Sequence, residues 1–273
     1  MRPAHLAVTL TAHGSRDPRA ARATEALTRA VAARQPAWEV RASYLDHAGP
    51  RPREVLASFA EAGHRRAVLV PLLLTAAYHG RVDVPGEITA ARAQFPGLAV
   101  TQADVLGPVD GRVPELLLDG LTTRLGAAGG LDGLPSRLGA AGVTSRSGVA
   151  AGLDAVVLAA AGTRNASARA TVEQAAAALS ARLGLPCRVA YASAAPPLSG
   201  DVVRDLRAEG HERIGLASYF LAPGLLWDAA VASARAAGAG VVAEPLTDVP
   251  AVAELVSARV HAARVAPVTV LAA

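Results

Sequence analysis

The feature that most constrains the fold is an imperfect internal duplication. A short apolar run at 6–12 ends in the turn His-Gly-Ser-Arg-Asp, and a similar run at 154–161 ends in Gly-Thr-Arg-Asn. The tetrad Gly-His-x-Arg occurs at 63–66 and again at 210–213, each time just before another apolar run. Two copies of one β/α unit therefore explain the 273 residues better than two unrelated domains do.

Strand and helix patterns alternate within each copy. In the first copy, Asp17 and Pro18 predict a helix start, as N-cap and first helical residue. The predicted strands lie at 6–12, 38–44, 67–74 and 98–103, and the predicted helices at 20–34, 52–62, 83–94 and 113–124. This order predicts an α/β fold with two similar lobes, each a parallel sheet flanked by helices. The expected domains are a first lobe at 1–125, a linker rich in Gly, Ala and Ser at 126–152, and a second lobe at 153–273.

Composition removes several classes of function. The net charge of +4 comes mainly from arginines spread along helical segments, with no aromatic strip beside them, so we expect no nucleic-acid partner. We find neither a signal-peptide pattern at the start nor an apolar run long enough to span a membrane, so we expect a cytoplasmic protein without a membrane partner. One cysteine, Cys187, excludes an internal disulfide framework and is interpreted as an apolar strand residue.

Two histidines are the main candidates for functional residues in this sequence. His13 and His79 each follow an apolar strand-like run and precede a glycine, and open α/β sheets bind ligands at the carboxyl ends of their strands. Either residue alone fits an ordinary turn, but two imidazoles with a nearby carboxylate suit an exchangeable divalent metal. Asp46 follows the intervening strand and is the predicted carboxylate. His47 is interpreted as a surface residue, with the site within its reach as the alternative.

The second copy keeps some of these residues and lacks others. It has Ala161 where the first has His13, Ser193 in place of Asp46, and Leu225 or a neighbour in place of His79. We therefore expect no metal site in the second copy. By contrast, the Gly-His-x-Arg histidines, His64 and His211, occur in both copies, which favours a role in turns or caps.

These motifs resemble the sirohydrochlorin chelatase family (CbiX/SirB), the class II tetrapyrrole chelatases, in its long two-domain form. The resemblance lies in Ala-His-Gly-Ser-Arg-Asp at 12–17, Tyr-Leu-Asp at 44–46, Gly-His-Arg-Arg at 63–66 and the segment 71–85. His79, Asp83 and Pro85 match a family phrase of the form H-x-x-x-D-x-P. The similarity is strong in the first half and weak in the second.

The resemblance implies a chelatase-like fold with a cleft between its lobes and a lyase-type activity. That activity is ATP-independent insertion of Fe²⁺ or Co²⁺ into sirohydrochlorin, for sirohaem or cobalamin biosynthesis; Ni²⁺ would also suit the ligands, and no nucleotide is expected. His13 and His79 match the family's metal-binding and proton-accepting positions. At Asp46 many relatives have glutamate, so this carboxylate is one methylene shorter.

The expected partner is sirohydrochlorin, bound by a monomer or homodimer. Because this macrocycle carries eight carboxylates, the residues around the two histidines are the expected substrate contacts. They are Gly14, Ser15, Arg16, Gly80 and Arg81.

Three other functions compete with the chelatase. A phosphatase or mutase with a nucleophilic histidine would need Arg-His-Gly, but Ala12 precedes His13. A dinucleotide-binding oxidoreductase would need Gly-x-Gly-x-x-Gly after the first strand, where the turn has a single glycine. A non-catalytic metal or tetrapyrrole carrier would use the same residues, so the sequence leaves that alternative open.

Overall fold

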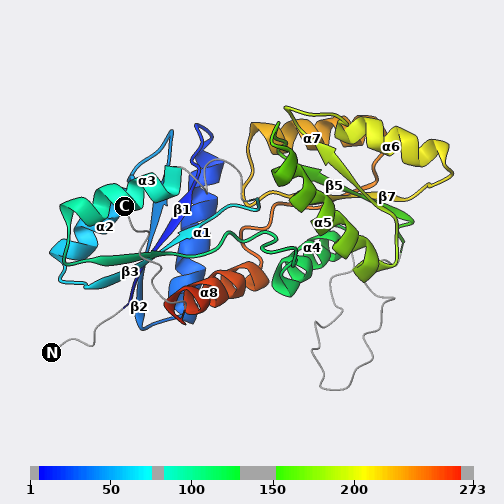
Figure 1. Ribbon diagram of the computed structural model, residues 1–273. Coiled ribbons are helices and arrows are strands. Elements are labelled where there is room, and N and C mark those ends of the chain that lie inside the picture. Colours follow the sequence, from blue (N-terminus) through cyan, green and yellow to red (C-terminus); the bar gives the residue numbers. More distant parts are fainter. Residues whose placement is uncertain (1–5, 76–82, 130–151, 266–273) are drawn as a thin grey trace, which may run out of the picture. The chain divides into compact units, whose positions relative to one another are not determined.

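The structure is a computed structural model that describes residues 6–75, 83–129 and 152–265 (Figure 1). These residues form two four-stranded parallel sheets, with strand orders β2-β1-β3-β4 and β6-β5-β7-β8. The strands of the first sheet are β1 (Leu6–Ala12), β2 (Trp38–Tyr44), β3 (Arg66–Pro71) and β4 (Ala99–Gln102). Those of the second are β5 (Ala155–Ala160), β6 (Cys187–Tyr191), β7 (Ile214–Tyr219) and β8 (Val241–Val242). The predicted fold class, α/β with two similar halves, is confirmed.

The chain divides into two compact units, each built on one sheet. Unit 1 contains 1–110 and 250–273, and unit 2 contains 111–249. In unit 1, α1 (Pro18–Arg34) and α8 (Pro250–Val265) cover one face of the sheet, while α2 (Pro52–Glu61) and α3 (Val84–Gln94) cover the other (Figure 1). The inner strands β1 and β3 are apolar over most of their length because helices bury both faces of the sheet.

Unit 2 repeats this arrangement. The pair α4 (Glu115–Ala128) and α5 (Ala166–Leu183) lies on one face of its sheet, and the pair α6 (Ser199–Ala208) and α7 (Leu225–Ala236) lies on the other (Figure 1). Every residue of β5 and β7 is buried, as expected for inner strands. The predicted duplication therefore extends to the order of strands and the placement of helices.

The two helices that end the half-sequences are exchanged between the units. Helix α4 follows β4 in the chain, yet it packs against β7 and β8 of unit 2. Helix α8 follows β8, yet it packs against α1 and β3 of unit 1. The arginines Arg124 and Arg259 anchor these helices: Arg124 Nε donates to the carbonyl of Pro245 (2.8 Å), and Arg259 Nη2 donates to that of Gly107 (3.0 Å).

This exchange differs from the predicted domain boundaries. The sequence assigns the helix at 113–124 to a first lobe ending at 125, whereas the structure places α4 in unit 2. The physical reason is that an apolar helix face fits either of two similar sheets, so the helical pattern does not say which sheet it covers. Residues 126–128 of the predicted linker are the last turn of α4, and 130–151 lie outside the described residues.

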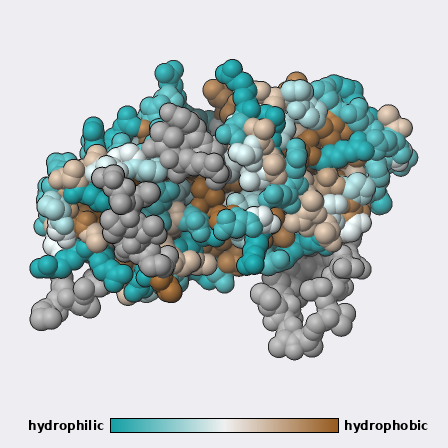
Figure 2. All heavy atoms as spheres, in the orientation of Figure 1, coloured by the Kyte–Doolittle hydropathy of each residue, from teal (hydrophilic) through white to brown (hydrophobic). Residues whose placement is uncertain are grey.

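Polar and apolar residues are both exposed on the face drawn in Figure 2. Teal and pale residues predominate over the face drawn in Figure 2, with smaller brown areas between them. Among the residues that the structure describes, we find no helix with the length and apolarity that a membrane crossing requires.

Candidate functional site

His13 lies at the position where open α/β sheets bind ligands. From β1 the chain moves to β2 on one side and later returns to β3 on the other, so the turns after β1 and β3 flank the point where the strand order reverses. His13 follows β1 directly. His79, in the connection from β3 to α3, lies outside the described residues, as do Gly80 and Arg81. The structure thus places one of the two predicted catalytic histidines.

The same turn brings His13 beside Asp46. Ladder-like hydrogen bonds continue beyond the ends of β1 and β2: the amide of Asp46 donates to the carbonyl of His13 (2.8 Å). Gly14 has φ +94°, a left-handed value, and a Cβ there would lie 1.8 Å from the carbonyl oxygen of Asp46. Glycine is therefore required for this close approach. On the ring, His13 Nδ1 lies 3.2 Å from the carbonyl oxygen of Gly14.

The Asp46 side chain is set up as a carboxylate. The backbone amide of His47 donates to Oδ1 (2.8 Å), which lowers the pKa of Asp46; positive charge at His47, Arg51 and His13 adds to this effect, while slight burial opposes it. An anionic oxygen beside an imidazole is a combination that suits divalent metals. Within the described ranges, however, no three His, Cys, Asp or Glu side chains form a ready-made metal site.

The remaining turn residues start helix α1. As predicted, Asp17 is the N-cap, and its carboxylate accepts from the amide of Arg19 (2.9 Å). Ser15 Oγ accepts from the amide of Asp17 (3.0 Å). Asp17 therefore caps the start of α1, while Arg16 is exposed to solvent.

His47 lies in the same cluster and is also exposed, so the structure favours the alternative that it lies within reach of the site. Its ring centroid lies 6.3 Å from that of His13, and its Nε2 lies 3.5 Å from Asp46 Oδ2. The residue has φ +59°, so the chain turns sharply after Asp46. The one signal in the sequence is its position next to Asp46, and that alone does not fix the direction of the ring.

Unit 2 has the same turn without these side chains. Gly162 also has φ +94°, and a Cβ there would lie 1.9 Å from the carbonyl oxygen of Ser193. The amide of Ser193 donates to the carbonyl of Ala161 (3.1 Å), which makes Ser193 the counterpart of Asp46. Leu225, the predicted counterpart of His79, begins α7, and its side chain is exposed.

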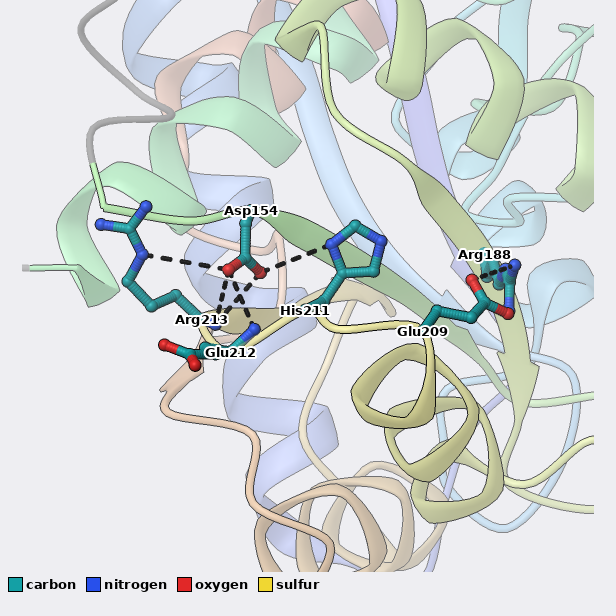
Figure 3. A network of polar contacts seen from close by, with 6 residues as sticks. All are labelled: Asp154, Arg188, Glu209, His211, Glu212 and Arg213. Carbon is teal, nitrogen blue, oxygen red and sulfur yellow. Dashed lines mark hydrogen bonds and ion pairs between the residues drawn. The ribbon is translucent and has the colours of Figure 1, made fainter.

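His64 and His211 are the histidines present in both copies. They lie just before β3 and β7, at the amino ends of the strands and so opposite the end that carries His13. His64 Nε2 pairs with Glu39 (2.7 Å), and His211 Nδ1 lies 3.8 Å from the Asp154 carboxylate. Figure 3 shows Asp154 between the His211 ring and the backbone of Arg213. These contacts support the predicted structural role.

A shallow groove of about 660 Å³ runs along the outer edge of unit 2, beside β6. Small side chains of α5, such as Ala176 and Ala177, line much of it together with Cys187. Burial raises the pKa of the Cys187 thiol to about 12, so it stays protonated and unreactive near neutral pH. The groove therefore holds no thiolate nucleophile at Cys187.

Comparisons with known proteins identify solved structures with the same fold. Similar solved structures include SirB from Bacillus subtilis with Fe³⁺, with a TM-score of 0.75, 19% identity and 96% coverage of both chains. The sirohydrochlorin chelatase SirB from Bacillus subtilis subspecies spizizenii in complex with cobalt has a TM-score of 0.72, 17% identity and 94% coverage of both chains. CbiX, the terminal enzyme for biosynthesis of sirohaem in denitrifying bacteria, has a TM-score of 0.60 and 21% identity, with 93% of this chain and 98% of that chain covered.

At these identities the solved structures show a shared fold. A search of curated proteins finds no match. A sequence model of the family CbiX, however, matches residues 7–123 and 155–263, which is most of both halves. The chain therefore belongs to the CbiX/SirB family of sirohydrochlorin chelatases, in its two-domain form.

Proposed function

We propose that this protein inserts a divalent metal, Fe²⁺ or Co²⁺, into sirohydrochlorin without ATP, for sirohaem or cobalamin biosynthesis. The observation that carries the proposal is that the turns holding His13 and Asp46, after β1 and β2, lie side by side, with the backbone amide of Asp46 donating to the backbone carbonyl of His13 (2.8 Å). Family membership and the relatives solved with Fe³⁺ and with cobalt support the choice of reaction and of metals.

The reaction needs a ligand that exchanges and a base that accepts protons. Insertion forms four metal–nitrogen bonds and releases the two pyrrole N–H protons of the macrocycle. We assign metal binding and proton uptake to His13 and His79, because neutral imidazole both ligates first-row metals and titrates near neutral pH. Asp46 supplies an auxiliary carboxylate, which offsets part of the charge of the metal ion before transfer.

Substrate binding falls to the turns that carry the histidines. We assign the carboxylates of the macrocycle to Arg16 and Arg81, since a guanidinium forms paired hydrogen bonds with a carboxylate. Ser15 and the backbone of Gly14 and Gly80 complete this set, because glycine lets a ligand approach the main chain closely.

The test is anaerobic metallation of sirohydrochlorin with Fe²⁺ and Co²⁺ supplied separately, followed by absorbance over many turnovers. We expect His13→Ala and His79→Ala to lower the turnover rate by about 100-fold or more, the range usual for removal of a general base. His261→Ala removes an exposed histidine of α8, and this control is expected to retain full activity.

The same assay decides between the enzyme and a metal or tetrapyrrole carrier. A carrier would bind metal or macrocycle in stoichiometric amounts, with no rate above the uncatalysed one. Multiple turnovers that depend on His13 support the chelatase, whereas stoichiometric binding alone contradicts it.

A further inference from the structure

His47 is an exposed imidazole held directly beside the Asp46 carboxylate. Its amide donates to Asp46 Oδ1 (2.8 Å), and its Nε2 lies 3.5 Å from Oδ2. About a third of the His47 side chain (36%) and more than half of the Asp46 side chain (57%) are exposed. Both groups are therefore accessible from solvent, next to the turn that carries His13.

The backbone at His47 is left-handed, a conformation that costs about 1–2 kcal/mol for a residue with a side chain. Glycine or asparagine would reduce this cost. An ion pair between exposed groups contributes about 0–1 kcal/mol, so the contact with Asp46 gives little stability in return.

Unit 2 serves as an internal control for this interpretation. Ala194 follows Ser193 as His47 follows Asp46, and it has φ +65°, so the same turn forms without an imidazole. His13, Asp46 and His47 correspond to Ala161, Ser193 and Ala194. The second copy thus keeps the backbone and lacks all three side chains together, which groups His47 with the other two.

The distance between the rings fits a shared ion after a small movement. With metal–nitrogen bonds of about 2.1 Å and a tetrahedral angle, two imidazoles on one ion have ring centroids roughly 5.3 Å apart. The centroids of His13 and His47 are 6.3 Å apart, and their planes are tilted by 34°. A closure of roughly 1 Å, achieved by side-chain rotation in exposed His47, would bring both rings onto one ion.

We propose that His47 is an additional metal ligand, which binds a divalent ion together with Asp46 and His13 before the ion is transferred. The later transfer of the ion to the macrocycle rests on the proposed function, whereas the binding of the ion by His47 does not. In this role His47 binds the hydrated metal ion as it arrives from solvent, at the exposed side of the turn.

The experiment is a titration of the full chain with Co²⁺ alone, without tetrapyrrole, comparing the wild type with His47→Ala and His47→Asn. Alanine is the residue of the second copy, and asparagine tolerates the left-handed backbone. We expect both variants to raise the Kd for Co²⁺ by about 10-fold or more. The NMR spectrum of the Co²⁺-bound wild type is expected to show one more paramagnetically shifted imidazole than either variant.

A second comparison separates coordination from folding. If His47 and His13 bind one ion, the effects of His47→Ala and His13→Ala on Co²⁺ affinity will not add in the double variant. Unchanged Co²⁺ affinity and an unchanged set of shifted imidazole resonances in both His47 variants would overturn the proposal. A wild type that binds Co²⁺ through His47 yet never metallates sirohydrochlorin would refute the proposed function and leave this inference intact.

Discussion

At the scale of single residues, two glycines fix the distance between neighbouring turns. Gly14 and Gly162 have the same φ of +94°, and each lies against a carbonyl oxygen of the turn after the next strand. In unit 1 that carbonyl belongs to Asp46, so the glycine sets how closely the turns of His13 and Asp46 approach. The site therefore requires a residue without a side chain at Gly14 as well as the side chains of His13 and Asp46.

Replacing Gly14 by alanine tests this dependence. A Cβ 1.8 Å from the Asp46 carbonyl forces the turn to move, in addition to the left-handed strain of about 1–2 kcal/mol. We expect Gly14→Ala to lower both the free energy of unfolding and the metallation rate. Gly63→Ala is the matched control: φ is +86°, but nothing lies within 4 Å of the added Cβ.

Urea unfolding measures the free energy of unfolding of Gly14→Ala and Gly63→Ala, and the metallation assay measures their rates. Gly63→Ala is expected to show the conformational cost alone and to keep the wild-type rate. Equal losses of stability, with equal rates, would mean that contact with Asp46 has no role.

At the scale of elements, the sequence predicts the strands well because alternation marks an edge strand and a continuous apolar run of this length marks an inner one. Trp38–Tyr44 is confirmed residue for residue, and the strand predicted at 67–74 is found at Arg66–Pro71. The helix start at Asp17 follows from capping chemistry, which is local. The direction of the His47 ring depends on a left-handed backbone angle that its residue type does not dictate, so the sequence alone does not decide between a surface residue and one that reaches the site.

A second local element is the turn before β7, which Asp154 holds (Figure 3). Its carboxylate accepts from the amides of Glu212 (2.9 Å) and Arg213 (3.0 Å). Burial acts to raise the pKa of Asp154, but these hydrogen bonds and the positive charge at His211 and Arg213 outweigh it and lower the pKa. The folded state thus favours the ionised carboxylate.

The lowered pKa predicts a pH-dependent contribution to stability. The stabilisation by Asp154 is complete well above the unfolded-state pKa of about 3.9, and it is lost as the pH falls through the lower folded-state pKa. Asp154→Asn is expected to cost about 1–3 kcal/mol near neutral pH. That difference from the wild type should shrink below about pH 4. Urea unfolding across this range measures it, and a difference independent of pH would contradict the assignment.

At the scale of the whole molecule, the exchange of α4 and α8 makes each unit depend on a helix from the other half of the sequence. Unit 1 is completed by residues from 250 onward, and unit 2 receives the helix that follows β4. The two anchors correspond: Arg124 contacts the segment after β8, and Arg259 contacts the segment after β4. A half-sequence cut from the chain at the linker would lack the helix that covers its own sheet.

This exchange predicts where a core substitution will act. Leu255 of α8 is 3% exposed and Leu121 of α4 is 1% exposed, and replacing either by alanine should cost about 2–5 kcal/mol. We expect Leu255→Ala, near the end of the chain, to speed amide hydrogen exchange in β3 and β4 of unit 1. Leu121→Ala, in the first half, should instead speed exchange in β7 and β8.

The measurement is amide hydrogen exchange followed by mass spectrometry on peptides from both sheets. Each variant serves as the control for the other. If the helices covered the sheets of their own half-sequences, the two patterns would be reversed. Faster exchange in β7 and β8 on Leu255→Ala would therefore contradict the exchanged arrangement. The crossed pattern would show that the cores of both units are built from both halves of the chain.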